Sequence, residues 1–172
     1  MKKVILTALI AFAGVTAANA QAQDQVSGSF QVTVNDYLDL TPSGAFGNVW
    51  NATFSNETEM NAGASGPVFA FSVDANRSWT ATATTGMFTR TAAAPAGVSY
   101  TVDPSSILTW TPGGTAGFGG PITASTGGVA VAGAAAGGSN VDFTLQGHLA
   151  NLYDDNMSGD YTSTTTIIAA LN

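Results

Sequence analysis

The chain of 172 residues contains no cysteine, a single histidine, and only four lysine and arginine residues against eleven acidic ones. Without a thiol it can form no disulfide framework, no cysteine-ligated zinc or iron–sulfur site and no cysteine nucleophile. Because phosphate neutralisation requires clustered basic side chains, the net charge of −7 argues against a nucleic-acid partner and against an anionic membrane surface.

The first twenty residues predict a cleaved signal peptide. Lys2 and Lys3 form its positive start, residues 4–13 form an apolar stretch too short to span a bilayer, and Ala18-Asn19-Ala20 has the small-x-small pattern of a cleavage site. The mature chain is then 21–172, with a net charge of −9 because the two lysines are removed. We expect it beyond the inner membrane, in the periplasm, at the cell surface or outside the cell, with no membrane insertion.

Apolar and polar side chains alternate along most of the mature chain. Phe30, Val32 and Val34 show the pattern first, and such a period of two predicts a strand with one buried face. Further candidate strands lie at 49–54, 68–73, 79–84, 98–102, 107–111, 129–132, 141–145 and 161–171. Turn-forming residues such as Pro112-Gly113-Gly114 separate them. This pattern predicts an all-β fold, a single antiparallel immunoglobulin-like β-sandwich over 21–172.

Residues 113–138 depart from this alternation because they hold ten of the twenty glycines. Glycine and alanine offer little surface to pack, so this segment is predicted to be a flexible connection or a long hairpin loop. Seven aromatic residues are the expected core anchors: Trp50, Phe69, Phe71, Trp79, Trp110, Phe143 and Tyr161. Trp110 is also the candidate for stacking on a ligand, because it ends a predicted strand beside the glycine-rich segment.

The chain offers little that indicates catalysis. His148 is the only histidine, so it cannot form a two-histidine metal site, and no Gly-x-Ser-x-Gly nucleophile motif accompanies it. Glu57 and Glu59 could share one strand face as a glycosidase pair, but their polar neighbours favour a solvated acidic turn. We therefore predict that the protein is not an enzyme and needs no cofactor.

One loop has the spacing of a calcium site. Asp154, Asn156, Ser158 and Asp160 place oxygen-bearing side chains at alternate positions around Gly159, as in the first half of an EF-hand loop. Thr165 stands where the bidentate glutamate of that loop belongs. A hairpin turn with glycine in the left-handed region explains the same residues without a metal.

The C-terminal part resembles a known group of bacterial surface proteins. Residues 143–149 read Phe-Thr-Leu-Gln-Gly-His-Leu, and Gly159-Asp160-Tyr161 precedes a threonine-rich last strand. These features are similar to bacterial secreted immunoglobulin-like and pilin-type β-sandwich proteins, namely the domain of unknown function 4402 family and, more distantly, spore-coat-U-like pilus subunits. The resemblance implies a protein that builds or decorates a cell surface.

Two functions follow as hypotheses. The first is a non-enzymatic structural or adhesive surface protein, including a fibre subunit, whose partners are other protein subunits or further copies of itself. In that case Phe30, Val32 and Val34 could be a donor strand added to the next subunit, although they could equally be the first strand of the chain's own sheet. The alternative is a monomeric extracellular module that binds carbohydrate or another surface polymer through Trp110.

Overall fold

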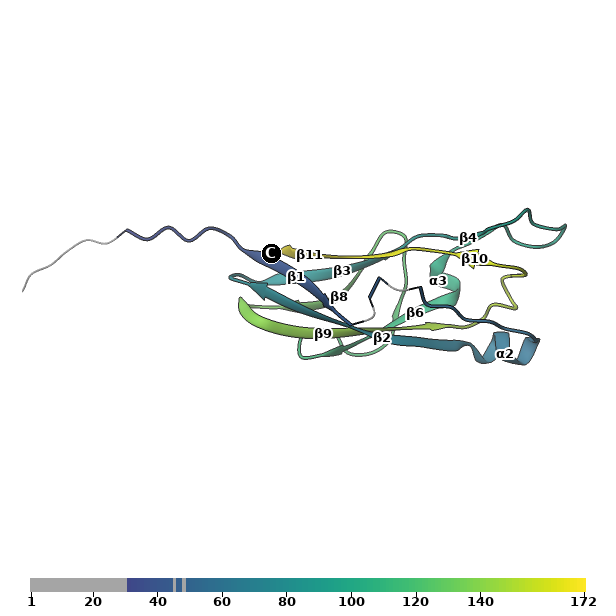
Figure 1. Ribbon diagram of the computed structural model, residues 1–172, viewed down its shortest axis with the longest axis horizontal. Helices are drawn as coiled ribbons and strands as arrows, with labels where there is room; N and C mark the ends of the chain where they lie inside the picture. The colour runs from purple at the N-terminus through teal and green to yellow at the C-terminus, as the bar shows by residue number, and fades with distance from the viewer. Residues whose placement is uncertain (1–30, 45, 48) are drawn as a thin grey trace, which may run out of the picture. The chain divides into compact units, whose positions relative to one another are not determined.

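The computed structural model describes residues 31–44, 46–47 and 49–172. The chain divides into two units, Met1–Val34 and Asn35–Asn172. In the first unit residues 31–34 are described, and they form no strand. The second unit, called the sandwich unit below, contains all the strands and helices shown in Figure 1. Among the described residues, no helix has the length and hydropathy to cross a membrane.

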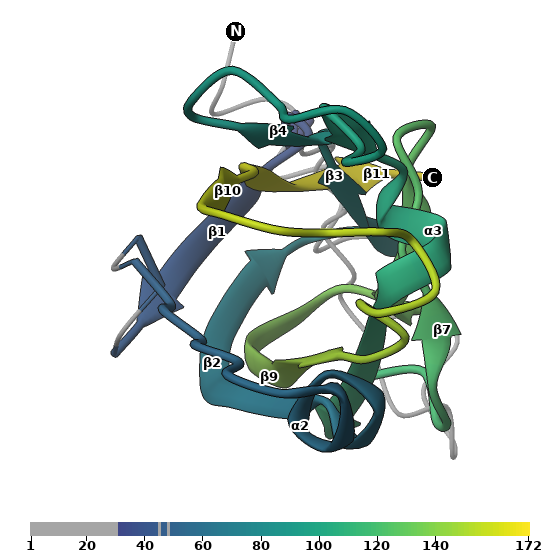
Figure 2. The same cartoon turned by 90° about the vertical axis from the view of Figure 1, so that its right-hand side faces the viewer.

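Five antiparallel strands make up the larger sheet of the sandwich unit. Their order across the sheet is β1 (Leu38–Ser43), β2 (Ala64–Ala75), β9 (Gly138–Leu149), β6 (Leu108–Gly114) and β7 (Ile122–Thr123). The two twelve-residue strands, β2 and β9, lie at its centre, and their register is interrupted by bulges. Bulges increase the local twist of a sheet, and Figure 2 shows the resulting curvature of β2 and β9.

Two three-stranded sheets complete the unit. One has the order β11 (Thr165–Leu171), β3 (Trp79–Thr85) and β8 (Val129–Ala134), and is called the β11–β3–β8 sheet below. The other has the order β10 (Tyr161–Thr162), β4 (Phe88–Arg90) and β5 (Thr101–Val102). Since β4 follows β3 and β10 precedes β11, the small sheet continues the β3–β11 pairing after a short interruption.

The core lies between the five-stranded sheet and the β11–β3–β8 sheet. On β3, Trp79, Ala81, Ala83 and Thr85 are buried and alternate with partly exposed threonines, as a strand with one buried face requires. Trp79 packs against Phe143 of β9 with ring centroids 6.2 Å apart. Side chains from both sheets thus share one core, and the predicted all-β sandwich is confirmed.

Five of the seven predicted core anchors are buried, while two are partly exposed. Phe69, Phe71, Trp79, Trp110 and Phe143 lie in the main core cluster. Trp50 is half-buried at its margin. Tyr161 packs on a second, smaller cluster around Val102, Ile107 and Leu152.

Two short helices occur where no helix was predicted. The helix α2 (Glu57–Ala62) begins at Asn56, whose side chain accepts a hydrogen bond from Glu59 N, while the Glu59 carboxylate accepts one from Ser55 N. The arrangement resembles a capping box, except that the Glu59 carboxylate bonds to the N–H one residue before the cap. The single-turn helix α3 (Pro104–Ile107) begins after Asp103, which caps Ser105 N, and has proline at its first position. Both helices begin after a residue, Asn56 or Asp103, whose side chain is also typical of turns.

Three expectations about strands need correction. Residues 49–54 form no strand, although the alternation predicted one. Residues 31–37 also form no strand, so the described part of the expected first strand is absent and the first strand begins at Leu38; Phe30 lies outside the described residues. Pro112-Gly113-Gly114, expected to be a turn, belongs to β6 and pairs with β9. Pro112 is tolerated there because β7, on the other side, pairs only with Thr109 and Trp110.

The glycine-rich segment 113–138 contains β7 and β8 as well as loops. Within it, Gly117 bridges Ala132 of β8, and Gly133 N donates to the Ala116 carbonyl at 3.0 Å. A Cβ on Gly117 would overlap the carbonyl group of Gly113, so the chain can approach itself there only without a side chain. Close backbone approach therefore explains part of the glycine content of this segment.

This packing predicts different effects for two glycines in the same segment. Gly117→Ala should lower the free energy of unfolding by about 1–3 kcal/mol, since the backbone of Gly113 must move to accept the methyl group. Gly119→Ala is the matched control, because no atom lies within 4 Å of its Cβ position. Chemical denaturation measures both. Equal stability of the two variants would contradict the close approach.

Candidate functional site

The last strand of the chain, β11, has an unpaired edge. It is paired with β3 over seven consecutive residues without a bulge. Its side chains alternate: Ile167, Ala169 and Leu171 pack against the core, while Thr166, Ile168 and Ala170 are exposed. The sequence of β11, Thr-Thr-Ile-Ile-Ala-Ala-Leu, does not itself alternate between apolar and polar residues, so the pairing with β3 decides which face is inside.

Two hydrogen bonds determine which backbone groups of β11 point to this edge. Gly86 N donates to Thr164 O and Asn172 N donates to Ser78 O, both at 2.9 Å. In an antiparallel pair the residues that bond to the partner alternate along the strand. The even-numbered residues of β11 therefore bond to β3. The odd-numbered residues, Thr165, Ile167, Ala169 and Leu171, direct their N–H and C=O groups to the other side, where none of residues 31–44, 46–47 and 49–172 pairs with them.

The other long edges of the two main sheets are protected. β1 carries Asp39 and Pro42, which are residue types that discourage strand addition. β8 is covered, because Phe118 N donates to Val131 O at 2.9 Å and the Ala116 carbonyl accepts from Gly133 N. β7 has only two residues. Within the part of the chain that the structure describes, β11 is thus the long strand edge without a hydrogen-bonded partner, although β1 of the facing sheet lies in contact with this strand.

Charge is distributed unevenly between the two main sheets. The strands β3, β8 and β11 contain no ionisable residue, whereas the five-stranded sheet carries Asp39, Asp74 and Asp142. In the register of that sheet, Asp39 lies directly opposite Asp74. In a chain with a net charge of −7, the β11–β3–β8 sheet therefore contributes no charged side chain of its own to a contact between two copies, although Asp39 lies on β1, which contacts β11.

Buried hydrogen bonds hold β11 in place from the core side. The Trp110 indole Nε1–H donates to Thr85 Oγ1 at 3.2 Å, and Thr85 Oγ1 lies 3.1 Å from Thr165 Oγ1. This chain of contacts joins β6, β3 and β11. At the other end of β11, Arg77 donates to the Asn172 carbonyl at 2.7 Å and to the Asp36 carboxylate at 2.6 Å. The strand is fixed at both ends while its outer edge stays unpaired.

Trp110 cannot act as the predicted ligand platform. Its side chain is 3% exposed, lies in the core cluster and uses its single donor on Thr85. The expectation that a tryptophan beside a glycine-rich segment faces a ligand is therefore wrong. The register explains the result, since Trp110 pairs with Gly147 and occupies an inward position of β6.

The predicted donor residues are available for pairing. Val32 is 80% exposed and Val34 is 74% exposed, and neither belongs to a strand. The third residue of the set, Phe30, lies outside the described residues. Exposed alternating valines without a strand partner are compatible with the donor hypothesis, which stays a prediction.

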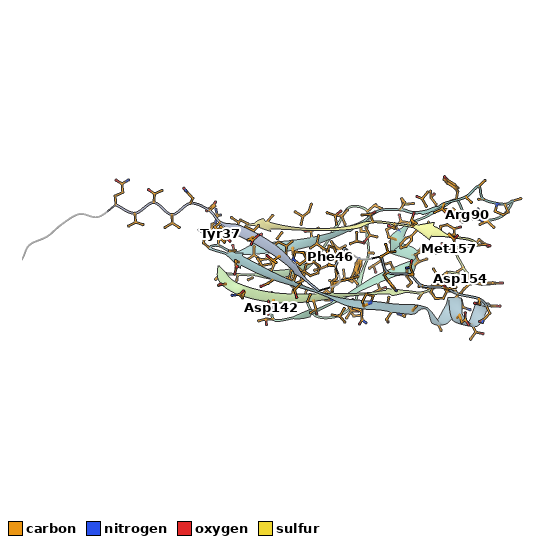
Figure 3. All side chains as sticks on the ribbon, in the orientation of Figure 1. Tyr37, Phe46, Arg90, Asp142, Asp154 and Met157 are labelled. Atoms are coloured by element: carbon orange, nitrogen blue, oxygen red, sulfur yellow. The ribbon has the colours of Figure 1, made fainter. Side chains whose placement is uncertain are left out.

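The loop with calcium-like spacing is occupied by a guanidinium group. Arg90 Nε donates to the Ser158 carbonyl at 2.6 Å, and its Nη1 donates to the carbonyls of Ala92 and Ala93. Gly159 follows with φ at 98°, where a side chain would overlap the Arg90 guanidinium. Figure 3 shows Arg90 and Asp154 at the same end of the sandwich unit.

The calcium hypothesis for Asp154, Asn156, Ser158 and Asp160 stays a prediction. Among the described residues, no three His, Asp or Glu side chains form a group that could hold a metal. Asn156 adopts a positive φ of 52°, as asparagine does in tight turns, and its carbonyl accepts a hydrogen bond from Ser99 N. The loop Asp154 to Asp160 thus folds around Arg90 and Ser99, which lie far from it in the sequence.

The sequence also missed a contact of the single histidine. His148 Nδ1 lies 3.0 Å from Ser65 Oγ, and the two residues are a cross-strand pair of β9 and β2. Ser65 is exposed and His148 is partly exposed, and the two residues are 83 positions apart in the chain, so no local sequence motif predicts their contact.

The two glutamates considered as a glycosidase pair, Glu57 and Glu59, lie on α2, where residues two apart do not share a face.

A shallow cleft of about 370 Å³ lies at the end of the unit that carries α2 and β10. Its apolar lining includes Phe54, Met60, Phe88, Leu152 and Met157. At the start of α3, hydrogen bonds from Ser105 lower the pKa of the Asp103 carboxyl below its ordinary value. That group caps a helix and does not face the cleft lining.

Comparison with protein-family models and with curated proteins finds no match for this chain.

The Arg90 contacts predict a structural role for this residue. Arg90→Met should lower the free energy of unfolding by about 2 kcal/mol, because three carbonyl groups lose a charged donor. Arg90→Lys should restore only part of this loss, since an ammonium group cannot span the same three acceptors. Arg77→Met is the control: it removes the exposed ion pair with Asp36 and the exposed hydrogen bond to Asn172, and should cost less than about 1 kcal/mol because both contacts are open to solvent. Similar losses in both methionine variants would contradict a special role of Arg90.

Thermal unfolding tests the calcium hypothesis. If the loop from Asp154 to Asp160 binds calcium, millimolar calcium should raise the Tm of the protein, because a ligand that binds only the folded state stabilises it. Magnesium at the same concentration and the variant Asp154→Asn are the controls. A Tm that does not respond to calcium ends the hypothesis.

Proposed function

We propose that the protein is a non-enzymatic structural or adhesive protein of the cell surface, secreted beyond the inner membrane, whose copies join by β-strand addition as fibre subunits do. The observation that carries the proposal is the unpaired edge of β11. Four residues of this strand direct backbone donors and acceptors outward, and no charge, proline or bulge protects them. Such an edge is a template for pairing with another chain.

The proposed donor is the segment containing Phe30, Val32 and Val34 of a second copy. A strand added to β11 would bond to Thr165, Ile167 and Ala169 through its backbone. On its core-facing side, alternate apolar side chains would lie beside Ile167 and Ala169, which are only partly buried at this margin of the core. The alternation of the donor segment matches this requirement, because every second residue is apolar and the residues between are polar.

The absence of charge on both partners supports the same pairing. Residues 30–34 read Phe-Gln-Val-Thr-Val, and β11 reads Thr-Thr-Ile-Ile-Ala-Ala-Leu. Neither contains an ionisable group, although the chain is acidic as a whole. The alternative function, a monomeric module that stacks carbohydrate on Trp110, loses its residue because Trp110 is buried.

The assembly state of the mature chain, 21–172, tests the proposal. Size-exclusion chromatography with light scattering should show discrete high-mass species, and the double variant Val32→Asp, Val34→Asp should lose them while keeping its folded circular-dichroism spectrum. The substituted carboxylates would lie at the core margin without partners, which opposes pairing.

Val49→Asp is the matched control for this experiment. Val49 is 81% exposed, close to the 80% of Val32, but lies outside the proposed donor segment. The Val49→Asp variant should polymerise as the unmodified chain does. A chain that stays monomeric at all concentrations would contradict fibre assembly, and loss of polymer in the Val49 variant would contradict the assignment of the donor.

A further inference from the structure

We propose that two unassembled copies of the protein also pair with each other directly, β11 to β11, in an antiparallel dimer whose two-fold axis passes through Ile168. This dimer goes beyond the proposed function, because it requires neither the donor segment nor a fibre. It would join two β11–β3–β8 sheets into one continuous six-stranded sheet. The occupant of the edge is a second copy of this chain.

The register of this pairing follows from the directions of the backbone groups. Odd-numbered residues of β11 face the open edge, so odd residues must meet odd residues across the interface. Centring the two-fold axis on Ile168 pairs Thr165 with Leu171 of the second copy and Ile167 with Ala169. In this register all seven residues of β11 find a partner, which no register centred on another residue of the strand achieves.

The same register explains the most exposed apolar side chain of β11. Ile168 is 58% exposed in the single chain. In the dimer it lies opposite its own copy in a pair that shares no hydrogen bond, where Cα atoms approach to about 4.5 Å and side chains are closest. Two isoleucines would then cover each other on the outer face of the joined sheet. Thr166 would meet Ala170 of the second copy on the same face.

Electrostatics select this contact among those open to two identical acidic chains. The three strands of the β11–β3–β8 sheet contain no ionisable residue, so joining two of them brings no like charges directly opposite each other. Pairing through β1 would instead bring Asp39 of each copy to the interface, with Asp74 of β2 beside it. The self-complementary edge also closes on itself, since an isologous contact leaves no free copy of the same surface.

The dimer has a consequence for assembly. A copy whose β11 is paired with another β11 cannot accept a donor strand on that edge. The unassembled protein would therefore be held as a closed dimer, and this dimer would have to dissociate before a donor strand could pair with β11.

Cysteine cross-linking tests the register, because the natural chain has no thiol to interfere. Ile168→Cys should form a disulfide-linked dimer on oxidation, since a directly opposed pair with Cα atoms about 4.5 Å apart is within disulfide reach. Thr166→Cys should not, because its two copies would be offset by four residues, about 13 Å along the strands. A mixture of Thr166→Cys and Ala170→Cys chains should cross-link as a heterodimer.

The control for random collision is Val68→Cys on β2. Val68 is 55% exposed, almost the same as Ile168, but lies on the five-stranded sheet. We expect at least a tenfold faster formation of dimer for Ile168→Cys than for Val68→Cys. Equal rates, or a Thr166→Cys dimer as fast as the Ile168→Cys dimer, would overturn the proposed pairing.

A background variant separates this proposal from the fibre proposal. In chains that also carry Val32→Asp and Val34→Asp, the donor segment is disabled, yet Ile168→Cys should still cross-link at the same rate. If Ile168→Cys does not cross-link in this background while the unmodified chain still forms polymer, the dimer proposal is overturned and the fibre proposal is not. Cross-linking without any polymer from the unmodified chain would support the dimer and contradict the fibre.

Discussion

The structure depends on aromatic packing that joins the two main sheets. Phe143 of β9 stacks on Phe71 of β2 at a centroid distance of 4.7 Å and contacts Trp79 of β3 across the core. Phe46, from the loop after β1, adds edge-on contacts to Phe69 and Phe71. Because an acidic chain without disulfides has few other sources of stability, burial of these large side chains must supply most of the favourable free energy.

This packing also leaves an edge of the core incomplete. The β11–β3–β8 sheet has three strands against five in the sheet that it covers, so its outer strand cannot bury its inward side chains fully. β11 is nevertheless held firmly by β3, by Thr85 and by Arg77. A strand that is already paired with β3, uncharged and unpaired on its other side loses little conformational entropy on accepting another strand. We propose the segment with Phe30, Val32 and Val34 and the β11 of a second copy as two alternative partners for this edge.

Alternation predicted the strands that lie in the centre of a sheet, where one face is buried along the whole length. The predictions at 68–73, 79–84 and 141–145 are confirmed within β2, β3 and β9. Residues 49–54 alternate equally well but find no strand partner, and pairing depends on segments distant in sequence. The starts of α2 at Asn56 and of α3 at Asp103 cannot be told from turns in the sequence, because a helix cap and a turn use the same side-chain chemistry. For the candidate site, the threonine-rich last strand was predicted, but not that its outer edge is open.

The sequence by itself determined the all-β class, the two-residue period and the identity of most core aromatics, since these follow from which side chains must leave water. It also carried the acidic charge and the alternation of Phe30, Val32 and Val34. Only the tertiary structure decided that Trp110 faces inward, that Arg90 occupies the loop at Ser158, and that β11 ends its sheet. Each of these depends on strand order and on contacts between residues far apart in the chain, which no local pattern encodes.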